Sequence, residues 1–269
     1  MTLLLQVSDP HFGTERPAVV AALERLCATL RPDVLLLSGD ITQRATSAQF
    51  TAARAFVDRL AVPVCLALPG NHDIPLFNLS QRLFSPYARF SAAFGSVLAP
   101  GFDDADVLLQ SVNTTRWWRH ADGQVSAAQV SQVVQRLALD HSPRWKLVMV
   151  HQPLAVTRAE DAKNLLHGHA QALASWRAAG VDVVLGGHIH LPYVLPLVDA
   201  PGGKLLWVVQ AGTAISQRVR AEAGNSVNVL RLLVGPPRVG VVERWDCHAG
   251  RSEFEQVAVR RLEAAQPQA

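Results

Sequence analysis

Short apolar runs alternate with amphipathic segments along the first third of the chain. Three of these runs predict buried strands, at residues 3–7, 34–37 and 63–68. Between them, apolar side chains recur at helical spacing at 17–30 and again around Phe50, Val57 and Leu60. A strand–helix–strand–helix–strand order with short connections is typical of parallel strands joined by right-handed crossovers. The pattern therefore predicts an α/β fold.

The regular pattern stops between residues 74 and 106, where prolines and aromatic residues follow no clean period. We expect an irregular, partly helical, cap-like insert there, lying over the strand ends. Further apolar runs then predict strands at 107–112, 146–150 and 181–184. Helices are predicted after Ser126, where Gln129 completes a capping box, and at about 170–179. Residues 154–169 are expected to form a second irregular loop.

The last part of the chain shows apolar runs without further chemical motifs. Strands are predicted near 204–210, 226–234 and 238–245. We expect these strands to form one closing sheet by meander. Residues 262–269 are predicted to be a frayed tail, so that a single domain covers residues 1–261.

Composition narrows the class of protein and of partner. Hydrophobic residues make up 49% of the 269 positions, which is ample for a sizeable core and too many for a disordered chain. The formal charge of +3 comes from scattered basic residues, so no nucleic-acid partner is expected, and a small anionic substrate suits the weak positive charge. Cys27, Cys65 and Cys247 lie far apart, which indicates neither a disulfide framework nor a thiolate zinc site.

Two further expectations concern location and assembly. No uninterrupted apolar run approaches the roughly 18 residues of a spanning helix, so none is expected. The segment Met1–Leu5 lacks the basic and apolar regions of a signal peptide, so a cytoplasmic location is predicted. Whether the chain forms a homo-oligomer stays open.

Polar side chains of metal-ligating types follow five of the apolar runs. In open α/β sheets, ligands gather outside the carboxyl ends of strands, so these side chains are expected to converge. His188 and His190 follow the run at 181–184 with one residue between them. Alternate residues of an extended segment point to the same side, so both imidazoles are expected to face one site. The candidate ligands are Asp9, His11, Asp40, Asn71, His151, His188 and His190.

The type and number of these ligands indicate the metals. The set contains only nitrogen and oxygen donors and no thiolate. Such a set disfavours a structural zinc site and suits Mn, Fe, Zn or Co. Seven ligands are too many for one ion, but they suffice for two ions if a carboxylate bridges them. The sequence therefore predicts a site for two transition-metal ions.

The same five blocks resemble the calcineurin-like metallophosphoesterases, in the order of that family. The resemblance spans residues 9–190, about two-thirds of the chain, and rests on these blocks: Asp9-Pro10-His11, Gly39-Asp40, Gly70-Asn71-His72-Asp73, His151 and Gly187-His188-Ile189-His190. The segment 39–43, the insert after Asp73 and the helix that follows Gly123 are more similar to the bacterial class III cyclic-nucleotide phosphodiesterase branch.

The resemblance implies a fold and a role for each candidate residue. The implied fold is a four-layer α/β sandwich, with two mixed sheets flanked by helices. Asp9, His11 and His190 would hold the first metal, Asp40 would bridge to the second, and Asn71, His151 and His188 would complete it. His72 would sit beside the leaving group, with Asp73 orienting it. Mn and Fe are the favoured metals, with Zn or Co as alternatives.

Elementary chemistry supports such a site. Two cations can clamp a phosphoryl group and generate a hydroxide from water held between them, which attacks phosphorus in line. The Asn71 carbonyl can ligate a metal while its NH₂ faces a phosphate oxygen. A protonated His72 can assist the leaving oxygen.

The expected function is hydrolysis of a small phosphodiester, with cyclic nucleotides favoured. Alternatives within enzymes are a phosphomonoesterase, a glycerophosphodiester or lipid-linked pyrophosphate hydrolase, and a nuclease. From another class, the alternative is a non-catalytic scaffold on the same fold, which would be expected to have lost ligands.

Several other residues keep two interpretations. Trp117, Trp118 and His120 either stack a base or pack under the insert. Arg82 and Arg116 either meet phosphate or serve the structure. His167 and His169 lie either on a solvated loop or against the substrate.

Overall fold

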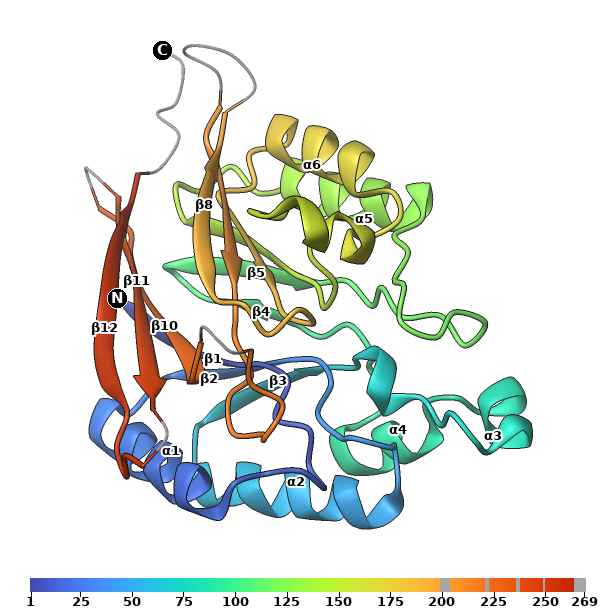
Figure 1. Cartoon of the computed structure of the whole chain (residues 1–269). Helices are drawn as coiled ribbons and strands as arrows, with labels where there is room; N and C mark the ends of the chain where they lie inside the picture. The colour runs from blue at the N-terminus through green and yellow to red at the C-terminus, as the bar shows by residue number, and fades with distance from the viewer. Residues whose placement is uncertain (199–203, 221–222, 236–237, 249, 264–269) are drawn as a thin grey trace.

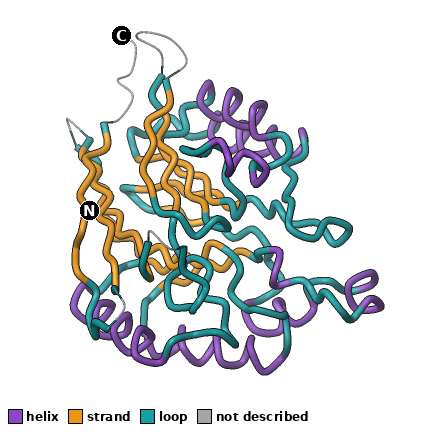
Figure 2. Tube along the Cα trace, in the orientation of Figure 1, coloured by secondary structure: helices purple, strands orange, loops and turns teal. Residues whose placement is uncertain are grey.

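The computed structural model describes residues 1–198, 204–220, 223–235, 238–248 and 250–263. Two six-stranded sheets pack face to face, and helices cover both outer faces (Figure 1). The resulting order of layers is helix, sheet, sheet, helix, as Figure 2 also shows. The predicted four-layer α/β sandwich is thereby confirmed.

The first sheet has the strand order β12-β11-β10-β1-β2-β3. Its strands are β1 (Thr2–Val7), β2 (Val34–Ser38), β3 (Val64–Leu68), β10 (Asn225–Leu233), β11 (Val239–Cys247) and β12 (Glu255–Leu262). Strands β1, β2 and β3 pair in parallel, as the sequence predicts. Strands β10, β11 and β12 continue the sheet as an antiparallel meander on the other side of β1.

The second sheet has the order β4-β5-β6-β7-β9-β8. Its strands are β4 (Gly101–Asp103), β5 (Val107–Ser111), β6 (Trp145–Met149), β7 (Val183–Gly186), β8 (Tyr193–Leu197) and β9 (Leu206–Gln210). Strands β5, β6, β7 and β9 are parallel, and the two edge strands are antiparallel to their neighbours. Both sheets are therefore mixed.

Helices cover the outer face of each sheet, and two shorter ones form the insert. The helices are α1 (Pro17–Leu30), α2 (Ser47–Leu60), α3 (Leu79–Phe84), α4 (Ala88–Phe94), α5 (Ala127–Ala138) and α6 (His169–Ala178), with 3-10 turns η1 (Asn71–Asp73) and η2 (Ala159–Asn164). Helices α1 and α2 lie below the first sheet and α5 and α6 beside the second, while α3 projects from the body (Figure 1). The capping box of α5 forms as predicted, since the Ser126 and Gln129 side chains each accept from the other's backbone N–H.

Alternating side chains of the central strands feed two different cores. Leu3 and Leu5 of β1 pack with α1 and α2, whereas Leu4 packs between the sheets. In β2, Leu35 and Leu36 divide in the same way. Because both faces of these strands are buried, their sequence is continuously apolar rather than alternating. A third core lies between the second sheet and α5 and α6.

The prediction of one closing sheet from the three late strands is wrong. Strand β9 pairs in parallel with β7 of the second sheet, whereas β10 and β11 join the first sheet. Apolar periodicity identifies a strand but not its partner, because pairing depends on segments far apart in the chain. Strands β8 and β12 were not predicted. Pro196 lies within β8, at an edge of its sheet, where the missing N–H of proline is tolerated.

Two predicted boundaries differ from the structure. Strand β4 lies within the segment expected to be an irregular insert, so only its earlier part, with α3 and α4, stands outside the sheets. Leu262 is buried and pairs with Gly240 as the last residue of β12, so it belongs to the domain rather than to the tail. Residues 264–269 of the predicted tail lie outside the described residues.

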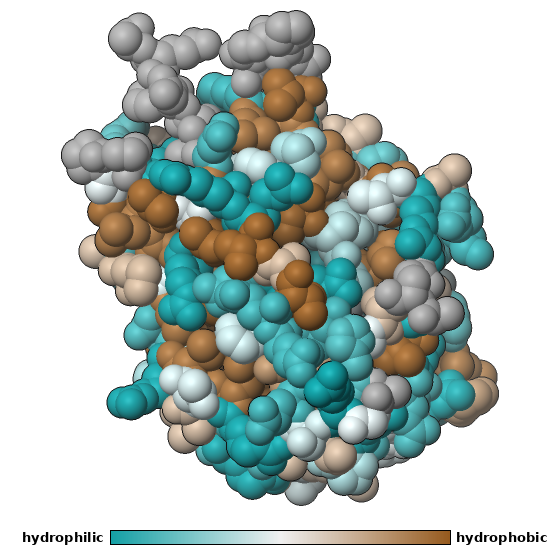
Figure 3. Space-filling model, turned by 60° about the vertical axis from the view of Figure 1, so that its left-hand side comes forward, coloured by the Kyte–Doolittle hydropathy of each residue, from teal (hydrophilic) through white to brown (hydrophobic). Residues whose placement is uncertain are grey.

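The surface and the cysteines carry little chemistry of their own. On the face drawn in Figure 3, hydrophobic patches are separated by hydrophilic residues. Among the described residues, no helix has the length and apolar character that crossing a membrane requires. All three cysteines are free, and burial raises the pKa of the Cys27 and Cys65 thiols to about 11, which keeps them as inert thiols.

Candidate metal centre

The candidate ligands follow the carboxyl ends of strands from both sheets. Asp9, Asp40 and Asn71 come after β1, β2 and β3 of the first sheet. His151 and His188 come after β6 and β7 of the second. The sandwich therefore brings side chains from two sheets to one place, as the position of ligands at strand ends predicts.

The backbone at five of these positions is unusual. Positive φ angles occur at Asp9 (51°), His11 (44°), Asp40 (49°), His188 (76°) and His190 (55°). Such angles are uncommon for residues other than glycine and cluster at functional sites. The expectation that His188 and His190 lie on an extended segment is therefore wrong. Both imidazoles still reach the same cluster, but through left-handed backbone turns.

The candidate ligands form two groups, which a third group of His11, Asp40 and His72 connects. One group consists of Asp9, His11 and His190, and the other of Asp40, His151 and His188. Within each group the potential ligand atoms all lie within 4.8 Å of one another. This division agrees with the two sets that the family resemblance implies. Asn71 opens the turn η1, beside His72, whose backbone N–H donates to Asp40.

Asp40 lies between the two groups and faces both. Its Oδ1 is 3.3 Å from His151 Nε2, and its Oδ2 is 3.8 Å from His11 Nε2. One carboxylate oxygen thus points toward each group. This geometry is what a carboxylate that bridges two ions requires.

Four buried atoms of the candidate ligands have no hydrogen-bond partner among the described residues. They are Asp9 Oδ1, Asn71 Oδ1, His151 Nε2 and His188 Nδ1. A buried polar atom without a partner costs roughly 1–3 kcal/mol. Four such atoms around one small volume are accounted for if they bind metal ions. The residues present therefore fit a two-metal site.

Outer hydrogen bonds orient the imidazoles. His151 Nδ1 lies 2.8 Å from the carbonyl oxygen of Ser38, and His190 Nδ1 lies 2.5 Å from that of Arg218. An N–H that donates to a carbonyl leaves Nε2 with the free electron pair that a metal needs. Asp9 is held similarly, because its Oδ2 accepts from Ser8 Oγ at 2.6 Å while its Oδ1 faces His190 Nε2 at 3.3 Å.

Two glycines allow the strand ends to approach closely. Gly39 has a φ of 101°, and a β-carbon there would collide with the His151 ring. A β-carbon at Gly187 would collide with the Ser8 side chain. Gly39 also has a backbone conformation that residues with a side chain disfavour. Both contacts join loops from opposite sheets at the site.

Protonation of the ligand-free site is uneven. Burial lowers the pKa of His11 to about 3 and that of His188 to about 4. Burial acts in the same direction on His151, but the neighbouring Asp40 carboxylate outweighs it and raises the pKa of His151 to about 9. At neutral pH the ligand-free chain therefore holds a proton on His151 that a metal ion must displace.

Metal binding is accordingly expected to tighten as the pH rises from 6 to 8. The pKa of His151 lies above this range, so each unit of pH changes the apparent affinity by roughly tenfold for one displaced proton. Titration of metal-free protein with Mn²⁺ in weakly buffered solution should release protons. An affinity that is independent of pH over this range would contradict the prediction.

His72 faces the same site from the turn η1. Its Nδ1 lies 2.9 Å from the carbonyl oxygen of Gln43, so Nε2 points away from that carbonyl. The ring packs edge-on against His11 with centroids 4.8 Å apart. His72 also forms a possible ligand group with His11 and Asp40.

Asp73 does not orient His72 as the resemblance implies. Its carboxylate accepts hydrogen bonds from the backbone N–H groups of Gly70, Ile41 and Thr42 and from the Thr42 hydroxyl. The His72 ring is held by Gln43 instead. Asp73 thus braces the loop that carries Asp40, because its four donors belong to the two neighbouring strand-end loops. The expectation that Asp73 orients His72 is therefore corrected. The sequence alone does not reveal the partners of Asp73, because most of them lie in another loop.

Comparison with known proteins identifies the chain. The model of the calcineurin-like phosphoesterase family matches residues 2–192, a segment that contains all seven candidate ligands. The chain belongs to this family. It is therefore a metal-dependent phosphoester hydrolase, and its fold and ligand groups indicate a dinuclear metal centre.

A curated relative and solved structures agree with this assignment. A Synechococcus protein described as a probable cyclic nucleotide phosphodiesterase is 31% identical over 207 residues, covering 72% of this chain and 76% of the relative. A dimetal phosphatase from Danio rerio has a TM-score of 0.70 at 16% identity, with 98% of this chain and 99% of that chain covered.

The fold also occurs in a protein with a different description. A Plasmodium protein described as the anchor in the inner membrane complex has a TM-score of 0.58 at 10% identity, covering 98% of this chain and 89% of that chain. At such identity the likeness shows the fold alone. Function in this phosphoesterase must therefore be argued from its site.

Arg218 is a residue of the phosphoesterase site that the sequence analysis missed. It lies in the loop after β9, and its Nη1 is 3.1 Å from His72 Nε2. The strand that precedes it neighbours β7, so the rule that sites form at strand ends could have indicated this loop. Apolar periodicity groups the strand Leu206–Gln210 with the other late strands, so it does not predict that this loop reaches the site.

Arg82 and Arg116 of the phosphoesterase donate hydrogen bonds to neighbouring segments. Arg82 donates to the carbonyl oxygens of Pro75 and Arg119. Arg116 donates to Gln129 Oε1 and to nearby carbonyl oxygens. These contacts favour the structural interpretation over phosphate binding for both residues.

A small hollow lies beside His72. It is lined by Gln43, Arg44, Asn71, His72, Ile74, Leu76, Arg82 and His120. His120, which sequence patterns left open, thus lies near the site. Trp117 and Trp118 pack against each other with ring centroids 5.4 Å apart and are 39% and 57% exposed. Their part in nucleotide binding stays a prediction.

Two remaining features lie apart from the ligand groups. His169 Nδ1 is 3.0 Å from the Leu166 carbonyl oxygen, and His167 is exposed near Asp122, which favours the loop interpretation for both.

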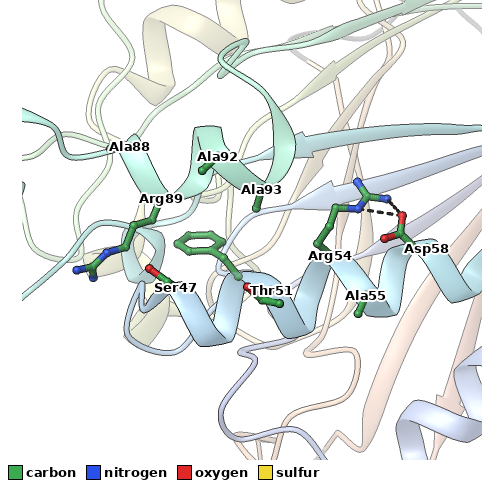
Figure 4. A pocket seen from close by; sticks show the side chains of 10 residues that line it. Ser47, Thr51, Arg54, Ala55, Asp58, Ala88, Arg89, Ala92 and Ala93 are labelled. Atoms are coloured by element: carbon green, nitrogen blue, oxygen red, sulfur yellow. Dashed lines mark hydrogen bonds and ion pairs between the residues drawn. The ribbon is translucent and has the colours of Figure 1, made fainter.

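A groove of about 480 Å³ lies between α2 and α4 (Figure 4). An ion pair of Arg54 and Asp58 lies along it, and none of the candidate ligands lines it.

Proposed function

We propose that this phosphoesterase hydrolyses a small phosphodiester, with a cyclic nucleotide as the favoured class of substrate. The observation that carries the proposal is the pair of ligand groups joined by Asp40. The Synechococcus relative supports the choice of a cyclic nucleotide, since it is described as a probable cyclic nucleotide phosphodiesterase.

The residues that would hold the two ions are those of the two groups. Asp9, His11 and His190 would bind one ion, and His151, His188 and the Asn71 carbonyl the other, with Asp40 shared. Manganese and iron are the proposed metals, and zinc or cobalt are alternatives, because the donors are imidazole, carboxylate and amide oxygen. When bound, the ions supply Lewis-acid charge to the phosphoryl group and activate water as the nucleophile.

The chain's own residues assist the departing oxygen. The Gln43 carbonyl holds His72 Nδ1, and this leaves Nε2 directed toward the site. We assign to Nε2 the proton that the leaving oxygen receives, which requires that Arg218 Nη1 then no longer donates to Nε2. The NH₂ of Asn71 is proposed to donate to a phosphate oxygen.

Activity is expected to depend on bound metal and to favour diesters. Chelation should abolish hydrolysis, and Mn²⁺ should restore it, because the ions activate the nucleophile. A panel of 3′,5′-cyclic AMP, bis-p-nitrophenyl phosphate and p-nitrophenyl phosphate, assayed at matched metal content, measures the preference. Faster cleavage of the monoester would favour a phosphomonoesterase. No turnover of any ester by protein with both ions bound would favour the scaffold.

A further inference from the structure

Arg218 combines an exposed position with contacts inside the candidate metal centre. Its Nη1 lies 3.1 Å from His72 Nε2, 3.2 Å from Gln43 Oε1 and 3.5 Å from both ring nitrogens of His11. It therefore lies between the proposed proton donor and a ligand of the first metal. Its backbone carbonyl accepts from His190 Nδ1, which anchors the loop to the same metal group.

In this position the Arg218 guanidinium lies against an amide oxygen and imidazole nitrogens. Among the described residues, no carboxylate forms an ion pair with Arg218, and its Nη1 lies nearest to the Gln43 amide oxygen and to ring nitrogens of His11 and His72. A guanidinium stays charged at all relevant pH values. Bound metal ions would add further positive charge nearby. This concentration of positive charge favours the binding of an anion.

A phosphoryl oxygen has the charge and size that suit this place. Arginine presents a planar fork of N–H donors that matches the oxygens of phosphate. A phosphoester at the metal centre, with its leaving oxygen near His72, brings its non-bridging oxygens into the region that Nη1 reaches. The carboxylates of the site face its histidines instead, since Asp9 and Asp40 point toward His190, His151 and His11.

We propose that the Arg218 guanidinium binds a non-bridging oxygen of the substrate's phosphoryl group, next to His72. This makes Arg218 a substrate-binding residue for phosphoesters. The inference deepens the proposed function, but it rests only on binding of a phosphoryl group and not on the identity of the ester. Inorganic phosphate is therefore a sufficient probe.

The side chain of Arg218 can be tested separately from its backbone. The hydrogen bond that orients His190 uses the backbone carbonyl, which Arg218→Ala retains. Gln217→Ala is a matched control, because Gln217 is an exposed neighbour on the same loop whose described hydrogen bond comes from its backbone N–H to the Thr14 carbonyl. Arg218→Lys keeps the positive charge but loses the planar set of N–H donors of the guanidinium.

The experiment measures phosphate binding to Mn²⁺-loaded protein by calorimetry, together with metal content. Arg218→Ala should retain two metals and bind phosphate roughly 10- to 100-fold more weakly, the effect of losing one charged hydrogen bond. Arg218→Lys should lie between this variant and the wild type, and Gln217→Ala should match the wild type. With an active substrate, KM should rise more than kcat falls.

Three results would overturn the inference. Unchanged phosphate affinity in Arg218→Ala would exclude the contact. Loss of a metal in that variant would show that the side chain supports the centre instead. Equal weakening in Gln217→Ala would assign the effect to the loop. If the wild type cleaves no phosphodiester but its phosphate binding depends on Arg218, the proposed function fails and this inference stands.

Discussion

Asp40→Ala is expected to lose both metal ions and to reduce kcat by roughly 10³-fold or more, since metal ions contribute several kcal/mol to stabilising charge at phosphorus. The reason is the position of the Asp40 carboxylate, which directs one oxygen toward His151 and the other toward His11. Removing a peripheral ligand such as His190 takes a donor from one group only. Elemental analysis of purified protein, with kcat measured on a diester, compares the variants.

Controls separate the loss of metal from a loss of fold. Asp40→Asn keeps the size of the side chain and an oxygen that can accept from the His72 N–H, but it lacks the negative charge. It is expected to fold and still to bind metal poorly. Asp58→Ala removes an exposed carboxylate of α2 and should match the wild type. Two ions retained at full occupancy in Asp40→Ala would refute the bridging position.

His72→Ala is expected to reduce the hydrolysis of a cyclic nucleotide by roughly 10²–10⁴-fold, the range for a positioned general acid. The loss should be far smaller for bis-p-nitrophenyl phosphate. A nitrophenolate leaves well unaided, whereas the alkoxide of a ribose holds negative charge badly and needs a proton. The measurement is kcat for both substrates on both proteins at matched metal content.

The metal content of His72→Ala decides between two roles of this ring, as a proton donor or as a metal ligand. The His72 ring lies close enough to His11 and Asp40 to form a third possible ligand group. If the variant retains both ions and its loss of kcat depends on the leaving group, His72 acts as the proton donor. Loss of an ion would make His72 a ligand, and equal losses on both substrates would argue against the acid. His141→Ala, at an exposed position, serves as the control.

The corrections at the site share one physical cause. Asp73 was expected to act on its neighbour His72, yet its carboxylate serves the loop that follows β2. The choice between these partners depends on which hydrogen-bond donors the tertiary structure brings near. Arg218 was missed for the same reason, since its loop reaches the site only because β9 pairs with β7.

The sequence by itself determined the strands that begin the fold, the family, and the set of candidate ligands. Each rests on a local property: continuous apolar runs for strands buried on both faces, and the types of residue that follow them. The first helix at 17–30 and the capping box at Ser126 were also predictable, because apolar spacing and caps lie within one segment.

Only the tertiary structure decided how these pieces meet. It divided the ligands into two groups sharing Asp40, and it distributed the late strands between two sheets. Neither follows from periodicity, because strand pairing joins segments far apart in the chain. The left-handed backbone at His188 and His190 is likewise stabilised by surrounding contacts, such as the His190–Arg218 hydrogen bond, that no local pattern of residues contains.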